Sequence, residues 1–202
     1  MARSPSANAG DGSTGAAPLT PIGVVLAGGA STRMGWDKAT IELQGEKLVL
    51  RSVRLLGEIC QQVVVADAGR GLISTSIPDG PGKGPAAGIL GAAQVFPGRP
   101  LLVLAVDIPR IQTPLLEEIA GSSADLAIPR WAGRLEPLCA LYGPAALAEL
   151  AMRVGAGRFD LHSLPDTPGL IVRYLEEDEI RRFGAPEEIF LNLNRPQDLE
   201  RL

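Results

Sequence analysis

The 202-residue sequence contains a single histidine, His162, and only two cysteines, Cys60 and Cys139. One histidine excludes every catalytic mechanism and every metal site that needs two. The cysteines lie far apart in apolar surroundings and lack the spacing of metal ligands, so they indicate buried free thiols in a reducing compartment. We therefore expect a cytoplasmic protein.

The chain also lacks long hydrophobic runs and an excess of positive charge. No apolar stretch reaches the length needed to cross a membrane, and the first residues do not follow the charged-then-apolar order of a signal peptide. The 19 Lys and Arg residues stand against 23 Asp and Glu residues, for a net charge of −4. Because binding of duplex nucleic acid usually needs clustered positive charge, neither nucleic acid nor a membrane is expected as a partner.

Glycine and proline, in contrast, are abundant, with 24 and 17 residues. Residues 1–20 are rich in Ala, Gly, Ser and Pro without any hydrophobic period, which predicts a disordered tail. Apolar runs begin after Pro21, and we expect one domain over residues 21–202. Within it, glycine and proline gather directly after expected strands, which predicts sharply turned loops there.

Apolar strands alternate with helical patterns over the first half of this domain. Strands are expected at 22–27, 63–65, 101–106, 126–128, 137–142, 170–174 and 189–193. Helices are expected at 47–59, 85–96, 145–154 and 196–202, with His162 in a further helix and Thr113-Pro114 capping another. The alternation predicts an α/β fold, a mostly parallel mixed sheet with helices on both faces.

The most informative segment is LAGGASTRMGWDK at residues 26–38, which follows the first expected strand. It therefore lies at the carboxyl edge of the sheet, where α/β proteins bind ligands. Adjacent glycines let backbone amides approach a phosphate, and Ser31, Arg33 and Lys38 add donors and positive charge. The segment matches neither a Walker A loop nor Gly-x-Gly-x-x-Gly. A glycine turn with solvated charges is the alternative on composition alone.

This segment resembles the opening signature of the nucleotidyltransferase superfamily, and it is most similar to the molybdenum cofactor guanylyltransferase family. The resemblance implies a single-domain, three-layer, Rossmann-like nucleotidyltransferase fold. It also implies that the loop binds the nucleoside triphosphate and that two of its cations neutralise the phosphates. The implied nucleotide-binding residues of this loop are Leu26, Ala27, Gly28, Gly29 and Lys38, with Arg33 and Lys38 catalytic.

Two further motifs follow in the order of that family. Asp79, followed by GPAAG at 84–88, resembles its Asp and Gly-Pro-Leu-Ala-Gly elements, which implies that Asp79 binds the nucleoside. Asp107 in VDIP at 106–109 resembles the Asp-x-Pro element, whose Asp binds the metal; Asp107 is therefore expected to bind nucleotide and Mg²⁺ and to be catalytic. Mg²⁺ takes one or two protein carboxylates and completes its shell with water and phosphate. Taken alone, either aspartate would be read as a turn former.

The later motifs concern the acceptor. The stretch GRLEPLCALY at 133–142 resembles the segment that precedes a strand on the acceptor side of the family, and FLNLNRPQDL at 190–199 resembles the Asn-x-Asn-x-Pro-x-Asp-Leu ending. Alternation along a strand places Asn192 and Asn194 on one face, where both amides could bind the acceptor. A helix cap is the alternative for Asn194. Ala66 stands where the family can carry an Asn that contacts the nucleotide, so that contact is absent here.

The resemblance implies Mg²⁺-dependent transfer of GMP from GTP to molybdopterin or Mo-molybdopterin, with release of pyrophosphate. The acceptor phosphate is already ionised, so no general base is needed. Transient contacts with molybdenum cofactor biosynthesis or recipient proteins are also expected. Two other reactions stay open, cytidylyl transfer to the same acceptor and nucleotidyl transfer to a sugar or polyol phosphate. A nucleotide-binding module without catalysis is the alternative from another class.

Overall fold

The computed structural model describes residues 20–28, 38–193 and 198. The tail expected over 1–20 and the helix expected over 196–202 thus fall outside the described residues, apart from Thr20 and Asp198. The division into tail and domain stays a prediction. Within the described ranges, no helix combines the length and the apolar character that spanning a bilayer requires.

The described strands of the main sheet are β1 (Ile22–Leu26), β4 (Val63–Ala66), β5 (Ser76–Ile77), β6 (Leu101–Ala105), β7 (Leu126–Trp131), β8 (Arg134–Leu135), β9 (Cys139–Tyr142) and β10 (Val172–Leu175). Their spatial order is β10-β7-β9-β6-β1-β4-β5, and β8 pairs with β7 as a hairpin. Strand β9 runs antiparallel to both of its neighbours, whereas the other neighbouring pairs along this path are parallel. The sheet is therefore mixed and mostly parallel, as expected.

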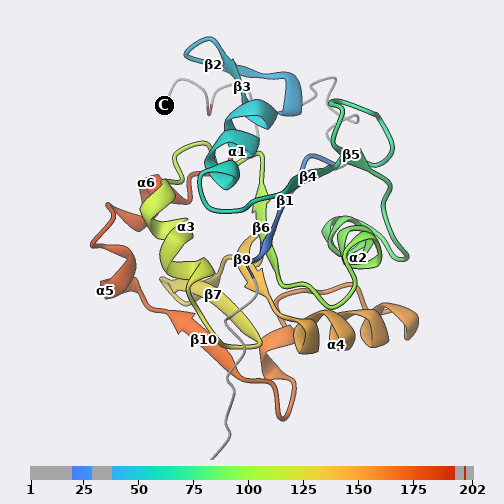
Figure 1. Cartoon of the computed structure of the whole chain (residues 1–202). Coiled ribbons are helices and arrows are strands. Elements are labelled where there is room, and N and C mark those ends of the chain that lie inside the picture. Colours follow the sequence, from blue (N-terminus) through green and yellow to red (C-terminus); the bar gives the residue numbers. More distant parts are fainter. Residues whose placement is uncertain (1–19, 29–37, 194–197, 199–202) are drawn as a thin grey trace, which may run out of the picture.

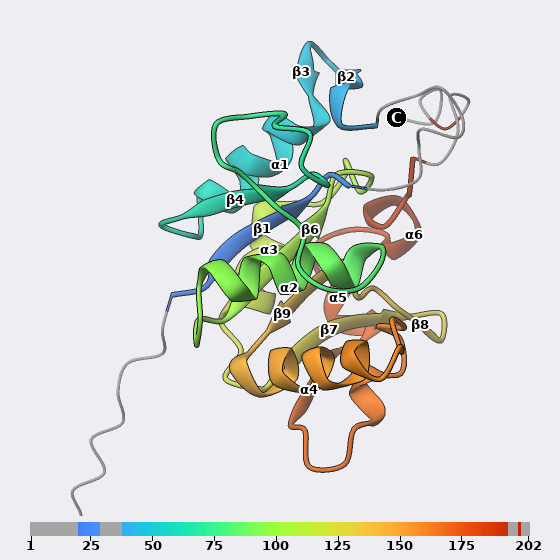
Figure 2. The ribbon, with the colours of Figure 1, turned by 90° about the vertical axis from the view of Figure 1, so that its right-hand side faces the viewer.

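The longer helices are α1 (Leu48–Gly57), α2 (Pro85–Val95), α3 (Thr113–Ala120) and α4 (Pro144–Gly155), and the shorter ones are η2 (Lys38–Thr40), η3 (Leu164–Asp166), α5 (Glu177–Ile180) and α6 (Pro186–Ile189). Helices α1 and α3 cover one face of the sheet, and α2 and α4 cover the other (Figure 1). A 90° turn shows the same three layers from the side (Figure 2). The α/β fold with helices on both faces is thereby confirmed.

The central strands are unbroken apolar runs because both faces of the sheet are covered. Every residue of β1 and of β6 is buried. Alternate side chains enter opposite halves of the core: Val25 and Leu104 pack with α1 and α3, while Val24 and Val103 pack with α2 and α4. Continuous hydrophobicity, rather than alternation, is thus what marks these strands in the sequence.

The strand expected at 189–193 was wrong. Ile189 instead ends helix α6, which Pro186 begins, and residues 190–193 form no strand. Proline at the first turn favours a helix start, since its missing N–H has no helical partner there. Phe190 and Leu193 are buried in the core on the α1 and α3 side, which explains their apolar character without a strand.

Two local expectations near helices were also wrong. Thr113 does not cap α3: it is the first helical residue after Gln112, and its hydroxyl donates to Glu58 at 2.6 Å. His162 lies in a turn rather than a helix, because the Asp160 carboxylate accepts its backbone N–H at 3.1 Å and so favours a turn.

One hairpin was not predicted at all. Strands β2 (Glu42–Leu43) and β3 (Glu46–Lys47) are joined by Gln44 and Gly45, whose φ values are +54° and +83°. Two consecutive residues with positive φ form the tight turn that matches the twist of a hairpin. Strands of two residues leave no periodic signal that the sequence could reveal.

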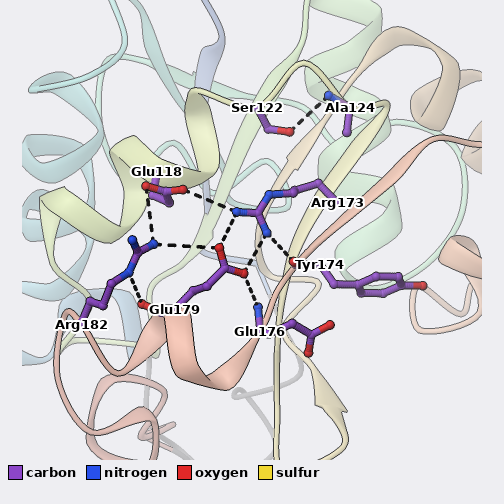
Figure 3. A network of polar contacts seen from close by, with 8 residues as sticks. All are labelled: Glu118, Ser122, Ala124, Arg173, Tyr174, Glu176, Glu179 and Arg182. Carbon is purple, nitrogen blue, oxygen red and sulfur yellow. Dashed lines mark hydrogen bonds and ion pairs between the residues drawn. The ribbon is translucent and has the colours of Figure 1, made fainter.

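Arg173 of β10 ties the edge of the sheet to two helices (Figure 3). Its guanidinium donates to both carboxylate oxygens of Glu179 at 2.7 and 2.9 Å and to the carbonyl of Tyr174 at 2.5 Å, and it lies 3.5 Å from Glu118 of α3. These hydrogen bonds from Arg173, together with one from the backbone N–H of Glu176, lower the pKa of Glu179 to about 2. The network therefore joins β10, α3 and α5 while Glu179 is ionised.

Arg173→Met should reduce the free energy of unfolding at pH 7 by about 1 kcal/mol, the range of a partly exposed ion-pair network. The folded pKa of Glu179 lies below its unfolded value of about 4.3, so the stabilisation is present above that pH and is lost as the pH falls through about 2. Urea unfolding at pH 7 and pH 2.5 measures this loss of stability. Arg182→Met is the comparison: Arg182 lies 3.9 Å from the same carboxylate, farther than Arg173, so its loss should cost less at pH 7. An equal destabilisation at both pH values would contradict the assignment.

Candidate functional site

Three parallel strands end together at one edge of the sheet. The register pairs Leu26 of β1 with Ala66 of β4 and with Ala105 of β6. The chain leaving β1 stays bonded to its neighbour, because the N–H groups of Ala27 and Gly28 both donate to the carbonyl of Ala66 at 2.9 and 3.1 Å. The residues that follow these strands are therefore brought side by side at the carboxyl edge, where α/β folds bind ligands.

Asp107 stands at the centre of this edge, two residues after β6. Its Oδ2 accepts a hydrogen bond from Lys38 Nζ at 3.0 Å across 69 residues of sequence, and both side chains are 21% exposed. Its Oδ1 is buried and has no hydrogen-bond partner among the described residues. A buried carboxylate oxygen without a donor is costly, so this atom is suited to receive a cation.

Lys38 is positioned by the chain that follows it. It opens the short helix η2, in which Ala39 is completely buried, and its carbonyl accepts the N–H of Ile41 at 3.3 Å. The carbonyl of Ile41 in turn accepts the N–H of Leu48, at the start of α1, at 2.9 Å. Lys38 thus projects from an anchored turn, and the structure brings it into contact with Asp107.

A second aspartate, Asp67, follows β4 at the same edge, and no sequence motif singled it out. It is completely buried, and its carboxylate accepts hydrogen bonds from the backbone of Arg70 at 3.0 Å, the backbone of Leu72 at 2.7 Å and the hydroxyl of Ser76 at 2.7 Å. Burial, the largest single influence, raises the pKa of Asp67, but these hydrogen bonds together lower it below its usual value. Asp67 thus organises its own loop as a carboxylate.

Arg70 connects that loop to the end of β1. Its guanidinium donates to the carbonyl of Asp67 at 2.9 Å and also to the carbonyl of Ala27. A guanidinium beside the Ala27–Gly28 backbone adds positive charge close to the expected phosphate-binding loop. The only sequence signal for this pair was an Asp directly after a buried strand.

Asp79 lies close to these residues on the side of β4. The residue as a whole is exposed, but partial burial of its carboxyl group raises its pKa. A hydrogen bond from the backbone N–H of Ala68 lowers this pKa, and the negative charge of Asp67 raises it further. Ala68 also touches Gly28, where an added Cβ would lie 3.3 Å from its nitrogen. Asp79 and Gly28 are therefore brought to the same corner, as expected for one binding site.

The chain around Asp79 is packed tightly on helix α2. The N–H of Gly80 donates to the carbonyl of Ala87 at 2.8 Å, and a Cβ on Gly91 would lie 2.3 Å from the carbonyl oxygen of Pro78. A Cβ on Gly88 would likewise lie 2.9 Å from Leu26 at the end of β1. Glycine is required at position 91 because the backbone of Pro78 approaches the helix too closely for a side chain, and this approach sets the position of Asp79.

The segment with the two expected acceptor-binding asparagines is only partly described. Leu193 donates its N–H to the carbonyl of Asp107 at 2.9 Å, so residues 190–193 pass beside the central aspartate. Asn192 is exposed there, and its amide nitrogen lies 3.5 Å from the carbonyl of Phe190. The argument from strand alternation is wrong because no strand forms. Gly29, Arg33 and Asn194 lie outside the described residues.

A further carboxylate, Glu136, lies on the β9 side of Asp107 and was not singled out from the sequence. Its Oε1 accepts a hydrogen bond from Trp131 Nε1 at 2.9 Å. Burial chiefly raises its pKa, and the negative charge of Asp107 adds to the rise. Its place directly before Pro137, in the stretch that resembles the family, was the signal that could have found it.

The described residues contain no group of three or more His, Cys, Asp and Glu side chains that could hold a metal ion. A cation at Asp107 would therefore take at most two of these side chains from the described residues and would complete its shell with water and phosphate oxygens, which is the pattern of a hard divalent ion. A separate cavity of about 500 Å³, lined among others by Pro21, Pro100 and Gly143, opens at the opposite edge of the sheet. It plays no part in this site.

Comparison with known proteins places this geometry among nucleotide-transferring enzymes. Residues 23–164 match the family model described as "MobA-like NTP transferase domain". A relative from Pelotomaculum thermopropionicum named "Probable molybdenum cofactor guanylyltransferase" is 31% identical over 188 residues, covering 90% of this chain and 91% of its own length. A relative of the same name from Opitutus terrae is 34% identical over 193 residues, covering 89% and 93%.

Solved structures share the fold. Molybdopterin-guanine dinucleotide biosynthesis protein A from Archaeoglobus fulgidus superposes with a TM-score of 0.74 at 27% identity, covering 89% of this chain and 95% of its own. A manganese complex of Rv0371c from Mycobacterium tuberculosis superposes with a TM-score of 0.63 at 16% identity, covering 91% and 98%. The second likeness concerns the fold alone.

Asp67→Ala should lower the free energy of unfolding by about 2–4 kcal/mol, because two backbone N–H groups and a hydroxyl lose a buried acceptor. Asp79→Ala is the matched control, since this aspartate is exposed and its loss should cost about 1 kcal/mol or less. Urea unfolding of the three proteins at pH 7 measures both. Equal losses would show that Asp67 does not organise the loop.

Proposed function

Because this chain belongs to the family of MobA-like NTP transferase domains, we propose that it transfers GMP from GTP to molybdopterin or Mo-molybdopterin and releases pyrophosphate. The relatives from Pelotomaculum and Opitutus, whose names state a guanylyltransferase activity, align over about nine-tenths of the chain. The observation that carries the proposal is the buried oxygen of Asp107, which has no hydrogen-bond partner among the described residues and lies beside the ammonium of Lys38. It supplies an anionic cation ligand and a fixed positive charge at one sheet edge.

The nucleotide would lie over the ends of β1 and β4. Backbone groups of Leu26, Ala27 and Gly28 line this part of the edge, and Asp79 stands at its corner. Asp79 would accept hydrogen bonds from the nucleoside, and Lys38 would neutralise charge on the triphosphate. Gly29 and Arg33, in the part of the loop that the structure does not describe, complete the proposed set.

Asp107 would hold the metal ion, for which we propose Mg²⁺. Its donor set fits, since one carboxylate with an open, buried oxygen is what a hard, largely hydrated cation takes from a protein. When bound, such an ion polarises phosphoryl oxygens and offsets the charge that develops in the transition state. Manganese in the complex of Rv0371c belongs to a protein of the same fold and is consistent with divalent metal use in this fold.

The transfer itself needs little from acid–base chemistry. An oxygen of the acceptor phosphate forms a bond to the α-phosphorus of GTP, and the bond from that phosphorus to the bridging oxygen breaks, so that pyrophosphate leaves with the electron pair. The attacking phosphate is already ionised, and the protein contributes positioning and charge neutralisation. Asn192 and Asn194 would bind the acceptor through their amides, next to Asp107.

The acceptor implies partners and a compartment. We propose transient contacts with proteins that supply molybdopterin or receive the finished cofactor. The two free cysteines, Cys60 and Cys139, are buried, and burial raises the pKa of the Cys60 thiol to about 11. Inert thiols of this kind suit the reducing cytoplasm in which we place the protein.

Asp107→Asn should lower the rate of pyrophosphate release from GTP, Mg²⁺ and molybdopterin by at least about 100-fold, since the amide removes the charge that holds the cation. Asp178→Asn, which removes an equal charge from an exposed position on α5, should leave the rate unchanged. Thermal unfolding of both variants is the control that they fold. Full activity of Asp107→Asn would refute the metal assignment.

The preference for guanine over other bases can be measured on the unmodified protein. Thermal shifts with GTP, CTP, UTP and ATP at equal concentration, each with Mg²⁺, should be largest for GTP, because the stabilisation of the folded state rises with the affinity of the ligand. Product analysis with molybdopterin then identifies the dinucleotide. A larger shift and a product with CTP would assign cytidylyl transfer, and a product with a sugar phosphate alone would assign the other alternative.

A further inference from the structure

The backbone at Glu136 is held on both sides by hydrogen bonds. Its N–H donates to the carbonyl of Pro129 in β7 at 3.1 Å, and its own carbonyl accepts the N–H of Cys139, the first residue of β9, at 3.0 Å. The residue thus stands in a tight turn between two strands of the sheet. Because the backbone is already fixed here, binding of a ligand costs little conformational entropy for ordering this turn.

The two residues after Glu136 are anchored as well. The carbonyl of Pro137 accepts the hydroxyl of the buried Tyr142 at 2.8 Å, and the carbonyl of Leu138 accepts the N–H of Ala105 at 2.8 Å. Ala105 is the last residue of β6, two positions before Asp107. The turn that carries Glu136 is therefore built directly onto the strand that carries the central aspartate.

The carboxyl group of Glu136 is oriented by an aromatic pair. Trp131 Nε1 donates to Oε1 at 2.9 Å, and the Trp131 ring stacks on Phe190, with centroids 6.1 Å apart and planes 15° apart. Phe190 leads into the segment that carries Asn192 past Asp107. The indole fixes one oxygen, and the remaining lone pairs of the carboxylate stay available to donors from a ligand.

We propose that Glu136 determines specificity for the acceptor by binding the 2-amino-4-oxopyrimidine edge of its pterin. That edge presents a ring N–H and an amino group side by side, which match the two oxygens of a carboxylate in a bidentate pair. The inference rests on the proposed function and names the group that recognises the acceptor's heterocycle. Neither of the roles proposed above for Asp107 and Lys38 provides such recognition.

The guanine of GTP carries the same hydrogen-bonding edge as the pterin. The location of Glu136 therefore decides which of these two heterocycles it binds. In the sheet order, Glu136 lies on the β7 and β9 side of β6, next to the segment of Asn192, whereas Asp79 and Gly28 lie on the β1 and β4 side. The triphosphate loop follows β1, which places the nucleotide on the far side of Asp107. The pterin of the acceptor is therefore the ligand that faces Glu136.

Two measurements on the full chain test the inference. In steady-state kinetics with GTP and Mg²⁺, Glu136→Gln should raise KM for molybdopterin by about 10- to 100-fold, the loss of a charge-assisted pair, and leave KM for GTP unchanged. Glu136→Asp should recover part of the loss, and Trp131→Phe should raise the same KM by a smaller factor. Glu117→Gln, at an exposed position on α3, should match the original protein.

The second measurement needs no turnover. In fluorescence titrations, the protein should bind 6-carboxypterin more tightly than 6-carboxylumazine, which has an oxo group in place of the 2-amino group, and Glu136→Gln should abolish the difference. This result supports the inference even if GTP and molybdopterin yield no product. The absence of a product would contradict only the proposed function. An unchanged KM for molybdopterin in an active Glu136→Gln variant, a raised KM for GTP instead, or equal binding of the two pteridines would overturn the inference.

Discussion

The parallel alignment of β1, β4 and β6 is the constraint on which the site depends. Because Leu26, Ala66 and Ala105 lie level in the sheet, the chain segments that leave these strands emerge at one edge and bond to one another. The alignment is stable because β1 and β6 are buried on both faces, so a shift of register would break the packing of two helical layers at once. The loop of Gly28, the Asp67 turn and Asp107 are neighbours for this reason alone.

Two aspartates at this edge illustrate how surroundings assign different roles to one residue type. Asp67 directs both carboxylate oxygens to hydrogen-bond donors of its own loop and is already satisfied. Asp107 offers one oxygen to Lys38, and its other oxygen is buried without a hydrogen-bond partner in the described part of the chain. A satisfied carboxylate supports structure, whereas an unsatisfied one beside a single cation attracts a further positive charge. The difference is electrostatic, and it points to Asp107 as the functional member.

The side of the site proposed for the acceptor is assembled from turns rather than from strand ends. Glu136 opens the tight turn between β8 and β9, and Asn192 follows the short helix α6. Both are tied to the β6 strand end, one through Leu138 and Ala105, the other through the bond from Leu193 to Asp107. A turn locked by its own hydrogen bonds can present a side chain as precisely as a strand does. The two halves of the site therefore meet at Asp107.

The α/β class, the buried strands that begin at Ile22, Val63 and Leu101, and the loops that follow them could all be predicted from the sequence. Continuous apolar runs and glycine-rich turns are local properties of the chain. The sequence also singled out Lys38, Asp79 and Asp107, which the structure brings to one edge. The hydrogen bonds of Asp67 and Arg70 within their loop, the orientation of Glu136 by Trp131 and the absence of a strand at 189–193 became visible only in the folded chain. These features depend on partners such as Ala27, Trp131 and Pro186 and on burial from several sides, and contacts between distant or turn-forming residues leave no period in the chain.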